Sequence, residues 1–305
     1  MARSVGALAG RLRGTPSVLR GAPGVLRAAP EMLRDAPGAL LGAVTAAGQE
    51  LAWLAAHAVT YPVGLLSEQA VADDPRYRID TLPPVIRGLI TGDINASGRP
   101  VLLVHGIGDN RSAFSILRRT LRRRGYGRIS TVNYSPLTSD IRKAAANLAT
   151  QVERVCQQTG YEQVFLVGHS LGGIIARYYV QCAGGDQRVH TLVTLGSPHA
   201  GTQLARLAPL PVCQQLRPNS ELMRELARPA DCRTRFVAIH SDRDEVVLPN
   251  RSARLEHPDL TVSRIQVHGV GHLSLLVNST VAHAVAGALA EPSGGCERVE
   301  FALNG

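Results

Sequence analysis

A glycine-framed serine, GHSLG at positions 168–172, constrains the fold of this chain more than any other feature. It follows a compact apolar run, Val164–Val167, and precedes a helix-like segment at 171–182. A strand, a sharp turn and a helix in this order present the serine at the tip of the turn, at the N-terminus of the helix. Glycines two residues before and after the serine let the strand and the helix pass each other without a side-chain clash. The pattern therefore predicts an exposed Ser170 in a strand–turn–helix unit.

Alternating strand and helix patterns continue on both sides of this unit, from residue 99 onward. Short apolar runs predict strands, and longer amphipathic segments predict helices. Such alternation is typical of the α/β class, with a mostly parallel sheet covered by helices on both faces and functional residues at the carboxyl ends of the strands. We expect strands at 101–104, 129–133, 164–167, 189–195, 236–240 and 262–267, and helices at 112–124, 140–158, 171–182 and 274–289.

The 305 residues divide by composition into several regions. Residues 1–75 form a basic, partly apolar extension in which prolines recur every seven residues, at positions 16, 23, 30 and 37. Proline in each heptad blocks a continuous helix, so short helical turns are expected there. A linker follows at 76–98, then the main α/β domain at 99–291, with a small cap segment at 201–235, and a C-terminal tail at 292–305.

The net charge of +9 is carried almost entirely by arginine, because Lys143 is the single lysine. Basic charge without a groove-reading or base-stacking motif does not indicate nucleic-acid binding, so no nucleic-acid partner is expected. Two interpretations of residues 1–75 stay open: a disordered basic extension, or an amphipathic ribbon that contacts an anionic membrane. No apolar run reaches the ~20 residues of a membrane span, and no clear signal peptide stands out. A cytoplasmic or peripherally membrane-associated protein is therefore expected.

Five cysteines occur without a C-x-x-C pair, and no set of metal-binding residues stands out. No cofactor and no catalytic metal are therefore expected. Cys213 and Cys232 either pair with each other or remain free thiols, and the second interpretation is favoured.

A serine hydroxyl needs a base to remove its proton before it can act as a nucleophile. His272 is the best placed histidine, since it follows a predicted strand in the run HGVGHL, whose glycines allow a tight loop that turns the imidazole toward Ser170. His268, in the same run, is the alternative, although we expect it to support the end of the strand instead.

The base in turn needs a carboxylate that fixes its tautomer and stabilises its charged form. Asp244 follows the predicted strand at 236–240, between the serine and the histidine, and this gives the chain order Ser, Asp, His. Asp242, in the same loop, is the alternative acid.

Negative charge that develops on a carbonyl oxygen under attack needs preorganised backbone N–H groups. We expect one from Leu171, directly after the serine, and the other from Ile107, in the loop after the first predicted strand. Gly106 and Gly108 free the backbone around Ile107, and His105 is expected to bond within the loop.

Together these residues resemble the class 2 family of small bacterial lipases and esterases in the α/β-hydrolase superfamily, and the run around His272 is similar to that of the minimal, nearly lidless lipases. The matching segments are 101–108, 164–173, 194–202, 241–247 and 267–276. The resemblance implies an α/β-hydrolase fold and hydrolysis of carboxylic esters of lipids or smaller acyl chains. It also implies a triad of Ser170, Asp244 and His272, oxyanion donors at Ile107 and Leu171, and motif support from His105, Gly106, Gly108, Gly168, His169 and Gly172.

The sequence departs from the minimal lipases between residues 201 and 235, where it is longer. Leucines in this cap segment either build an apolar acyl pocket or pack on the sheet. The expected function is a serine ester hydrolase that works through an acyl-enzyme. Acyl transfer or thioester hydrolysis on the same triad, and a non-catalytic membrane-associated protein with this fold, are the alternatives.

Overall fold

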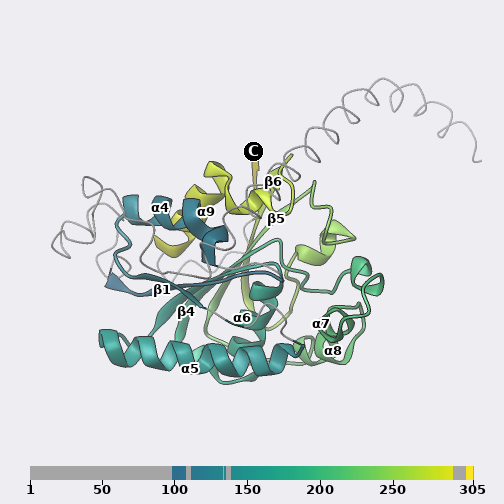
Figure 1. Cartoon of the computed structure of the whole chain (residues 1–305), viewed down its shortest axis with the longest axis horizontal. Helices are drawn as coiled ribbons and strands as arrows, with labels where there is room; N and C mark the ends of the chain where they lie inside the picture. Colours follow the sequence, from purple (N-terminus) through teal and green to yellow (C-terminus); the bar gives the residue numbers. More distant parts are fainter. Residues whose placement is uncertain (1–97, 108–110, 133, 135–138, 291–299, 305) are drawn as a thin grey trace, which may run out of the picture. The chain divides into compact units, whose positions relative to one another are not determined.

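An open sheet of seven parallel strands forms the centre of the part of the chain that the structure describes (Figure 1). The structure is a computed structural model, and it describes residues 98–107, 111–132, 134, 139–290 and 300–304. The order across the sheet is β2-β1-β3-β4-β5-β6-β7, and every neighbouring pair is parallel, so all carboxyl ends lie along one edge. In chain order the strands are β1 Val101–Val104, β2 Ile129–Val132, β3 Val164–His169, β4 Val189–Leu195, β5 Arg235–Ser241, β6 Thr261–His268 and β7 Glu300–Asn304.

Alternate residues of each buried strand contribute to two hydrophobic cores, one on each face of the sheet. In β1, Leu102 and Val104 belong to one core, and Val101 and Leu103 belong to the other. Helices α5 and α6 cover the first face and α4 and α9 cover the second (Figure 1). The predicted α/β class is therefore confirmed. The helices are α4 Ser115–Arg123, α5 Ile141–Thr159, α6 Leu171–Cys182 and α9 Ser279–Ala290.

Two helices begin differently from the sequence prediction. The helix expected at 112–124 begins as a 3-10 turn, η3 Arg111–Phe114, before α4. The helix expected at 274–289 is split into η7 Ser274–Leu276 and α9. The split occurs because the side chain of Asn278 accepts a hydrogen bond, 3.1 Å long, from the N–H three residues later, and so begins a new helix.

The sequence analysis also makes predictions for the N-terminal and C-terminal segments of the chain. The segment predicted as a C-terminal tail at 292–305 contains a strand that the sequence analysis did not expect, since Glu300–Asn304 pairs with β6 as a parallel edge strand. Residues 1–97 lie outside the described residues, and with them the predicted basic extension and almost all of the predicted linker. Within the described ranges, no helix is both long enough and apolar enough to cross a membrane.

The cap segment contains three short helical elements, η5 Gln203–Arg206, α7 Pro211–Gln215 and α8 Glu221–Leu226. Its second half packs on the core, as one of the two interpretations expects, whereas its first half presents apolar side chains to solvent. The buried leucines are Leu216, Leu222 and Leu226, and the exposed ones are Leu204, Leu207 and Leu210. Cys213 and Cys232 are both free thiols, as favoured from the sequence.

A buried arginine of α6 ties the cap to this helix. Arg177 is 3% exposed and donates from Nη1 to the carbonyl oxygen of His199, at 3.1 Å, and from Nη2 to that of Leu226, at 2.7 Å. Its Nε donates to Oε1 of Gln181 at 3.1 Å. Burial lowers the pKa of the guanidinium, and the hydrogen bonds offset part of the cost of burying its charge. Arg177 thus joins α6, the loop after β4 and α8.

The start of α6 approaches the end of β1 more closely than any side chain allows. A Cβ on Gly172 would lie 2.1 Å from the carbonyl oxygen of Val104 and 2.4 Å from that of His105. A Cβ on Gly168 would lie 2.5 Å from Cα of Gly173. Both contacts are with backbone, which cannot rotate out of the way. Packing therefore requires the two glycines of the serine pattern, and Gly172 lets the loop after β1 lie against the N-terminus of α6.

We expect Gly172→Ala to lower the free energy of unfolding by about 1–3 kcal/mol, because the new methyl group overpacks the contact with β1. Gly287→Ala is the matched control, since Gly287 lies within α9 and has nothing within 4 Å of its Cβ position. That change is expected to raise the free energy of unfolding by up to about 1 kcal/mol. Urea denaturation followed by circular dichroism measures both values. Equal midpoints for the two variants would contradict the packing argument.

Candidate active site

Ser170 lies at the sharp turn between β3 and α6, at the carboxyl edge of the sheet. Its φ of 53° and ψ of −121° are unusual for a residue with a side chain, and such strain is concentrated at functional turns. Its N–H donates to the carbonyl oxygen of Leu195 at the end of β4, at 2.9 Å, which ties the turn to the neighbouring strand. Ser170 is 8% exposed, less than the sequence predicts, because loops from the neighbouring parallel strands end at the same edge.

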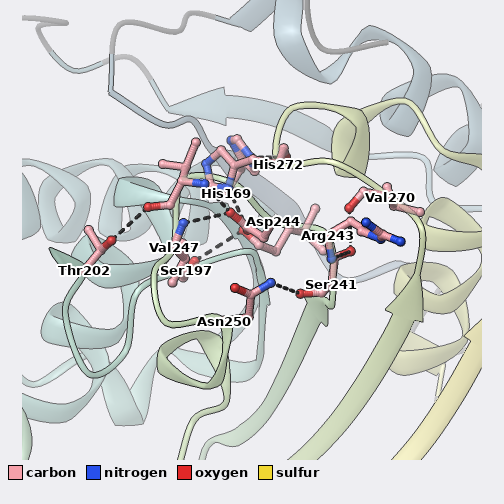
Figure 2. A network of polar contacts seen from close by, with 12 residues as sticks. His169, Ser197, Thr202, Ser241, Arg243, Asp244, Val247, Asn250, Val270 and His272 are labelled. Carbon is pink, nitrogen blue, oxygen red and sulfur yellow. Dashed lines mark hydrogen bonds and ion pairs between the residues drawn. The ribbon is translucent and has the colours of Figure 1, made fainter. Parts of the chain in front are cut away.

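A buried aspartate and histidine pair lies at this edge (Figure 2). Oδ2 of Asp244 is 2.8 Å from Nδ1 of His272, and the side chains are 0% and 5% exposed. Oδ1 accepts the N–H groups of Val246 and Val247, at 2.9 and 2.8 Å. Burial by itself raises the pKa of Asp244, but the hydrogen bond and charge of His272 and these two N–H groups outweigh it, so the net pKa is lowered. An ionised carboxylate only accepts, so Nδ1 of His272 carries a proton and donates it to Asp244.

Ring and backbone contacts place this pair beside Ser170. The imidazole of His169, the residue before the serine, lies 4.8 Å from the ring of His272 at an angle of 44°. Its Nε2 is 3.2 Å from the carbonyl oxygen of His272. Gly196 directly follows the carbonyl that binds the serine N–H, and a Cβ there would lie 3.0 Å from Oδ2 of Asp244 and 3.2 Å from Nδ1 of His272. The structure therefore brings the three predicted residues to one place, and His169, predicted as motif support, contacts His272.

The two alternatives that the sequence left open, Asp242 and His268, pair with each other. Oδ2 of Asp242 is 2.8 Å from Nδ1 of His268, and Oδ1 accepts the N–H of Gly269 at 2.9 Å. Burial raises the pKa of Asp242, but the hydrogen bonds from His268 and Gly269 outweigh it, so the net pKa is lowered. The two side chains are 39% and 38% exposed, so this pair is a surface contact that joins the loop after β5 to the end of β6. His268 thus supports the end of its strand, as expected.

Three polar side chains that sequence reasoning missed hold the loop around Asp244 (Figure 2). Oγ of Ser241 donates to the carbonyl oxygen of Val270, which connects the end of β5 to the loop that carries His272. Oγ1 of Thr202 donates to the carbonyl two residues after Asp244, at 2.8 Å. Nδ2 of Asn250 donates to the carbonyl two residues before Asp244, at 2.9 Å. Thr202 falls within a segment that carries the family resemblance, but no spacing signal marks its role or that of the other two.

The loop after β1 lies beside the first turn of α6, where the sequence predicts an oxyanion hole. Nδ1 of His105 donates to the carbonyl oxygen of Gly106, at 3.0 Å, so this histidine bonds within the loop as expected. Ile107 is 40% exposed. Leu171 is the first residue of α6, and the first N–H groups of a helix have no acceptor within the helix. Gly108 lies outside the described residues.

Known lipases are similar to this chain in sequence and in fold. The palmitoyl protein thioesterase family matches residues 100–231. A triacylglycerol lipase of Burkholderia plantarii is 32% identical over 125 residues, which cover 38% of this chain and 34% of that protein. A triacylglycerol lipase of Pseudarthrobacter phenanthrenivorans is 32% identical over 118 residues, 36% of either protein. The chain thus spans about a third of the length of these curated relatives.

The crystal structure of the mature Bacillus licheniformis lipase BlEst2 shares the fold. It matches with a TM-score of 0.54 and 20% identity, and covers 64% of this chain and 92% of that chain. The chain therefore has the α/β-hydrolase fold. In sequence it is similar to bacterial triacylglycerol lipases over rather more than a third of its length, which agrees with the resemblance of its motifs.

We expect Asp244→Asn to slow the reaction of Ser170 with a fluorophosphonate probe by about 10⁴-fold, because an amide at this position favours the wrong imidazole tautomer. Asp242→Asn is the matched control, since it makes the same change in the exposed pair. That variant should react within about tenfold of the wild-type rate, as is typical for loss of a surface ion pair. Fluorescent labelling over time, with mass spectrometry of the labelled peptide, measures both rates. If the Asp242 variant is the slower one, Asp242 is the acid.

Proposed function

We propose that this protein is a serine hydrolase that cleaves carboxylic esters of lipids or other acyl chains through an acyl-enzyme. The observation that carries the proposal is the buried pair of Asp244 and His272 beside the strained turn at Ser170. This arrangement supplies a nucleophile, a base and an acid that orients the base, in the chain order that α/β-hydrolases use. Relationship to bacterial lipases supports an ester as the substrate.

The first half of the proposed reaction forms the acyl-enzyme. Oγ of Ser170 attacks the carbonyl carbon of the ester while Nε2 of His272 accepts the hydroxyl proton. The N–H groups of Ile107 and Leu171 stabilise the negative charge on the carbonyl oxygen. The bond between this carbon and the alcohol oxygen then breaks, and His272 returns its proton to the leaving alcohol.

Water completes the cycle in the second half. Nε2 of His272 accepts a proton from water, whose oxygen attacks the acyl carbon. The bond to Oγ of Ser170 then breaks, Oγ regains the proton, and the carboxylic acid is released. Asp244 stays ionised throughout and stabilises the imidazolium, and this interaction is strong because solvent is excluded from the pair.

Exposed apolar side chains on the cap favour an acyl substrate. Leu207 is 80% exposed and Leu210 is 52% exposed, both in the first half of the cap. Leu248, 38% exposed, lies beside this stretch, since its carbonyl oxygen accepts the N–H of Gln203 at 2.8 Å. Leu248 also follows the loop that carries Asp244. An apolar surface therefore begins close to the acid of the triad, and it fits the hydrocarbon part of an ester.

We expect Ser170→Ala to lower kcat for p-nitrophenyl esters by about 10⁶-fold, because no other group replaces the nucleophile. Ser263→Ala is the matched control: it makes the same change in a half-buried serine near the amino end of β6, away from the carboxyl edge of the sheet, and it should keep its activity. Release of p-nitrophenol is measured for acetate, octanoate and palmitate esters. A kcat/KM that rises with chain length supports a lipid substrate. A Ser170 variant that retains most of the hydrolysis would overturn the proposal.

Thioester hydrolysis is the second candidate, because the family that matches residues 100–231 is the palmitoyl protein thioesterase family. The matched segment includes Ser170 and ends before Asp244 and His272. The same acyl-enzyme chemistry serves both reactions, since only the leaving group changes from an alcohol to a thiol. The ratio of kcat/KM for an octanoyl oxygen ester and the corresponding thioester ranks the two functions. Products formed with a competing alcohol detect acyl transfer, and a lack of probe labelling at Ser170 would favour a non-catalytic role.

We also propose that residues 1–75 hold the enzyme peripherally at an anionic membrane surface. Prolines, leucines and arginines repeat there in steps of seven residues, and the whole chain carries a net charge of +9. Basic residues near such a surface contribute roughly 1 kcal/mol each to binding. Membrane contact would bring the ester hydrolase close to lipid substrates.

We expect replacement of Arg20, Arg27 and Arg34 by Gln in the full chain to weaken binding to phosphatidylserine-containing vesicles by about a hundredfold. Sedimentation with these vesicles, and with purely zwitterionic ones, measures the binding. The matched control makes the same charge change at three exposed arginines in and after α4, namely Arg119, Arg123 and Arg124. An equal loss in both variants would assign binding to net charge and contradict a role of the extension.

A further inference from the structure

Tyr134, which follows β2, reaches across to the loop after β1. Its hydroxyl donates to the carbonyl oxygen of His105 and lies 3.2 Å from that of Gly106. Its ring stacks on the imidazole of His105, with centroids 4.2 Å apart and planes 9° apart. Both side chains are buried. Since Nδ1 of His105 also donates to the Gly106 carbonyl at 3.0 Å, two side chains hold this one oxygen.

Holding the Gly106 carbonyl fixes the direction of the next N–H. The peptide bond between Gly106 and Ile107 is trans, and in a trans peptide the C=O and N–H groups point in opposite directions. The carbonyl of Gly106 points toward Tyr134, so the N–H of Ile107 points away from Tyr134. The peptide plane cannot turn unless the hydrogen bonds to Tyr134 and His105 break.

A turned peptide would reverse the electrostatics of an oxyanion hole. The carbonyl oxygen, with its partial negative charge, would then lie where the N–H should be, and it would repel the developing oxyanion instead of stabilising it. Such a turn rotates the backbone about ψ of Gly106, and glycine, which has no Cβ, restricts this rotation less than any other residue. Glycine alone would leave the Gly106–Ile107 peptide free to turn. The hydrogen bonds from Tyr134 and His105 to the Gly106 carbonyl oppose this rotation.

We propose that Tyr134 is a positioning residue of the oxyanion hole, which together with His105 fixes the Gly106–Ile107 peptide so that the N–H of Ile107 faces the substrate carbonyl. This inference rests on the proposed function as a serine hydrolase. Tyr134 acts through the backbone and does not touch the substrate. Its effect therefore falls on stabilisation of the tetrahedral intermediate and leaves substrate binding unchanged.

Tyr134→Phe tests the inference, because it removes the hydroxyl and keeps the stacked ring. We expect kcat to fall about 10- to 100-fold, less than the 10²–10³-fold loss typical when an oxyanion donor is removed outright, with KM unchanged. Tyr126→Phe is the matched control. Tyr126 is equally buried, precedes β2 at the amino edge of the sheet, and its hydroxyl donates to the carbonyl oxygen of Ala286 at 3.1 Å. This control should keep the wild-type kcat.

An alkyl boronic acid gives a readout that a merely structural role would not move. Boronic acids form a tetrahedral adduct with the serine of such enzymes, and the adduct uses the oxyanion hole as the intermediate does. The inhibition constant for Tyr134→Phe should rise by the same factor by which kcat/KM falls. The pH profile of kcat/KM should stay unchanged, because the base His272 is untouched. His105→Ala, which removes the other donor to Gly106, should show the same pattern and decides the question if Tyr134→Phe does not fold.

The possible results distinguish failure of the positioning role of Tyr134 from failure of the proposed hydrolase function. If the wild type hydrolyses esters while Tyr134→Phe, or His105→Ala in its place, matches Tyr126→Phe in kcat and in boronic acid affinity, the positioning role is overturned and the serine hydrolase stands. If the wild type hydrolyses neither esters nor thioesters and does not react with a fluorophosphonate, both proposals fall.

Discussion

The hydrogen bond between the carboxylate of Asp244 and Nδ1 of His272 is the interaction on which the rest of the site depends. A carboxylate buried to this degree is stable only when N–H donors replace its lost water. One of its oxygens accepts two N–H groups of its own loop, and the other oxygen faces the imidazole. The shape of the loop and the tautomer of His272 are therefore coupled, because both depend on the hydrogen bonds of this one carboxylate.

Local patterns predict that Ser170, Asp244 and His272 lie together, because each follows a recognisable strand, and the fold brings the three to one edge of the sheet. Local patterns could not decide which of two aspartates, two residues apart, pairs with which of two histidines, four residues apart. That choice depends on the register between β5 and β6, in which Ser241 lies opposite Val267. Register between strands is a property of the folded sheet, so the sequence leaves this pairing open.

Side chains whose partners are backbone carbonyls escaped prediction. Tyr134, Arg177 and Thr202 all hold loops in this way, and every residue has a carbonyl, so no residue type or spacing marks the partner. The helix break at Asn278 likewise depends on one bond between a side chain and the backbone, and β7 depends on the open edge of β6. The sheet with its two cores was predictable, because the apolar pattern of strands and helices is visible along the chain.

The guanidinium of Arg177 holds one part of the cap, α8, against α6, whereas the stretch at 203–210 has no bond to this arginine among the described contacts. Separation of α8 from α6 would take a carbonyl away from a charged group in the interior, at about 1.5–3 kcal/mol for that bond alone. The stretch that contains Leu207 begins at Thr202, whose hydroxyl donates to the loop that carries Asp244. The leucines of this stretch are exposed to solvent. Substitutions in α8 will consequently affect thermal resistance first, whereas substitutions of Leu207 or Leu210 will change an apolar surface that faces solvent.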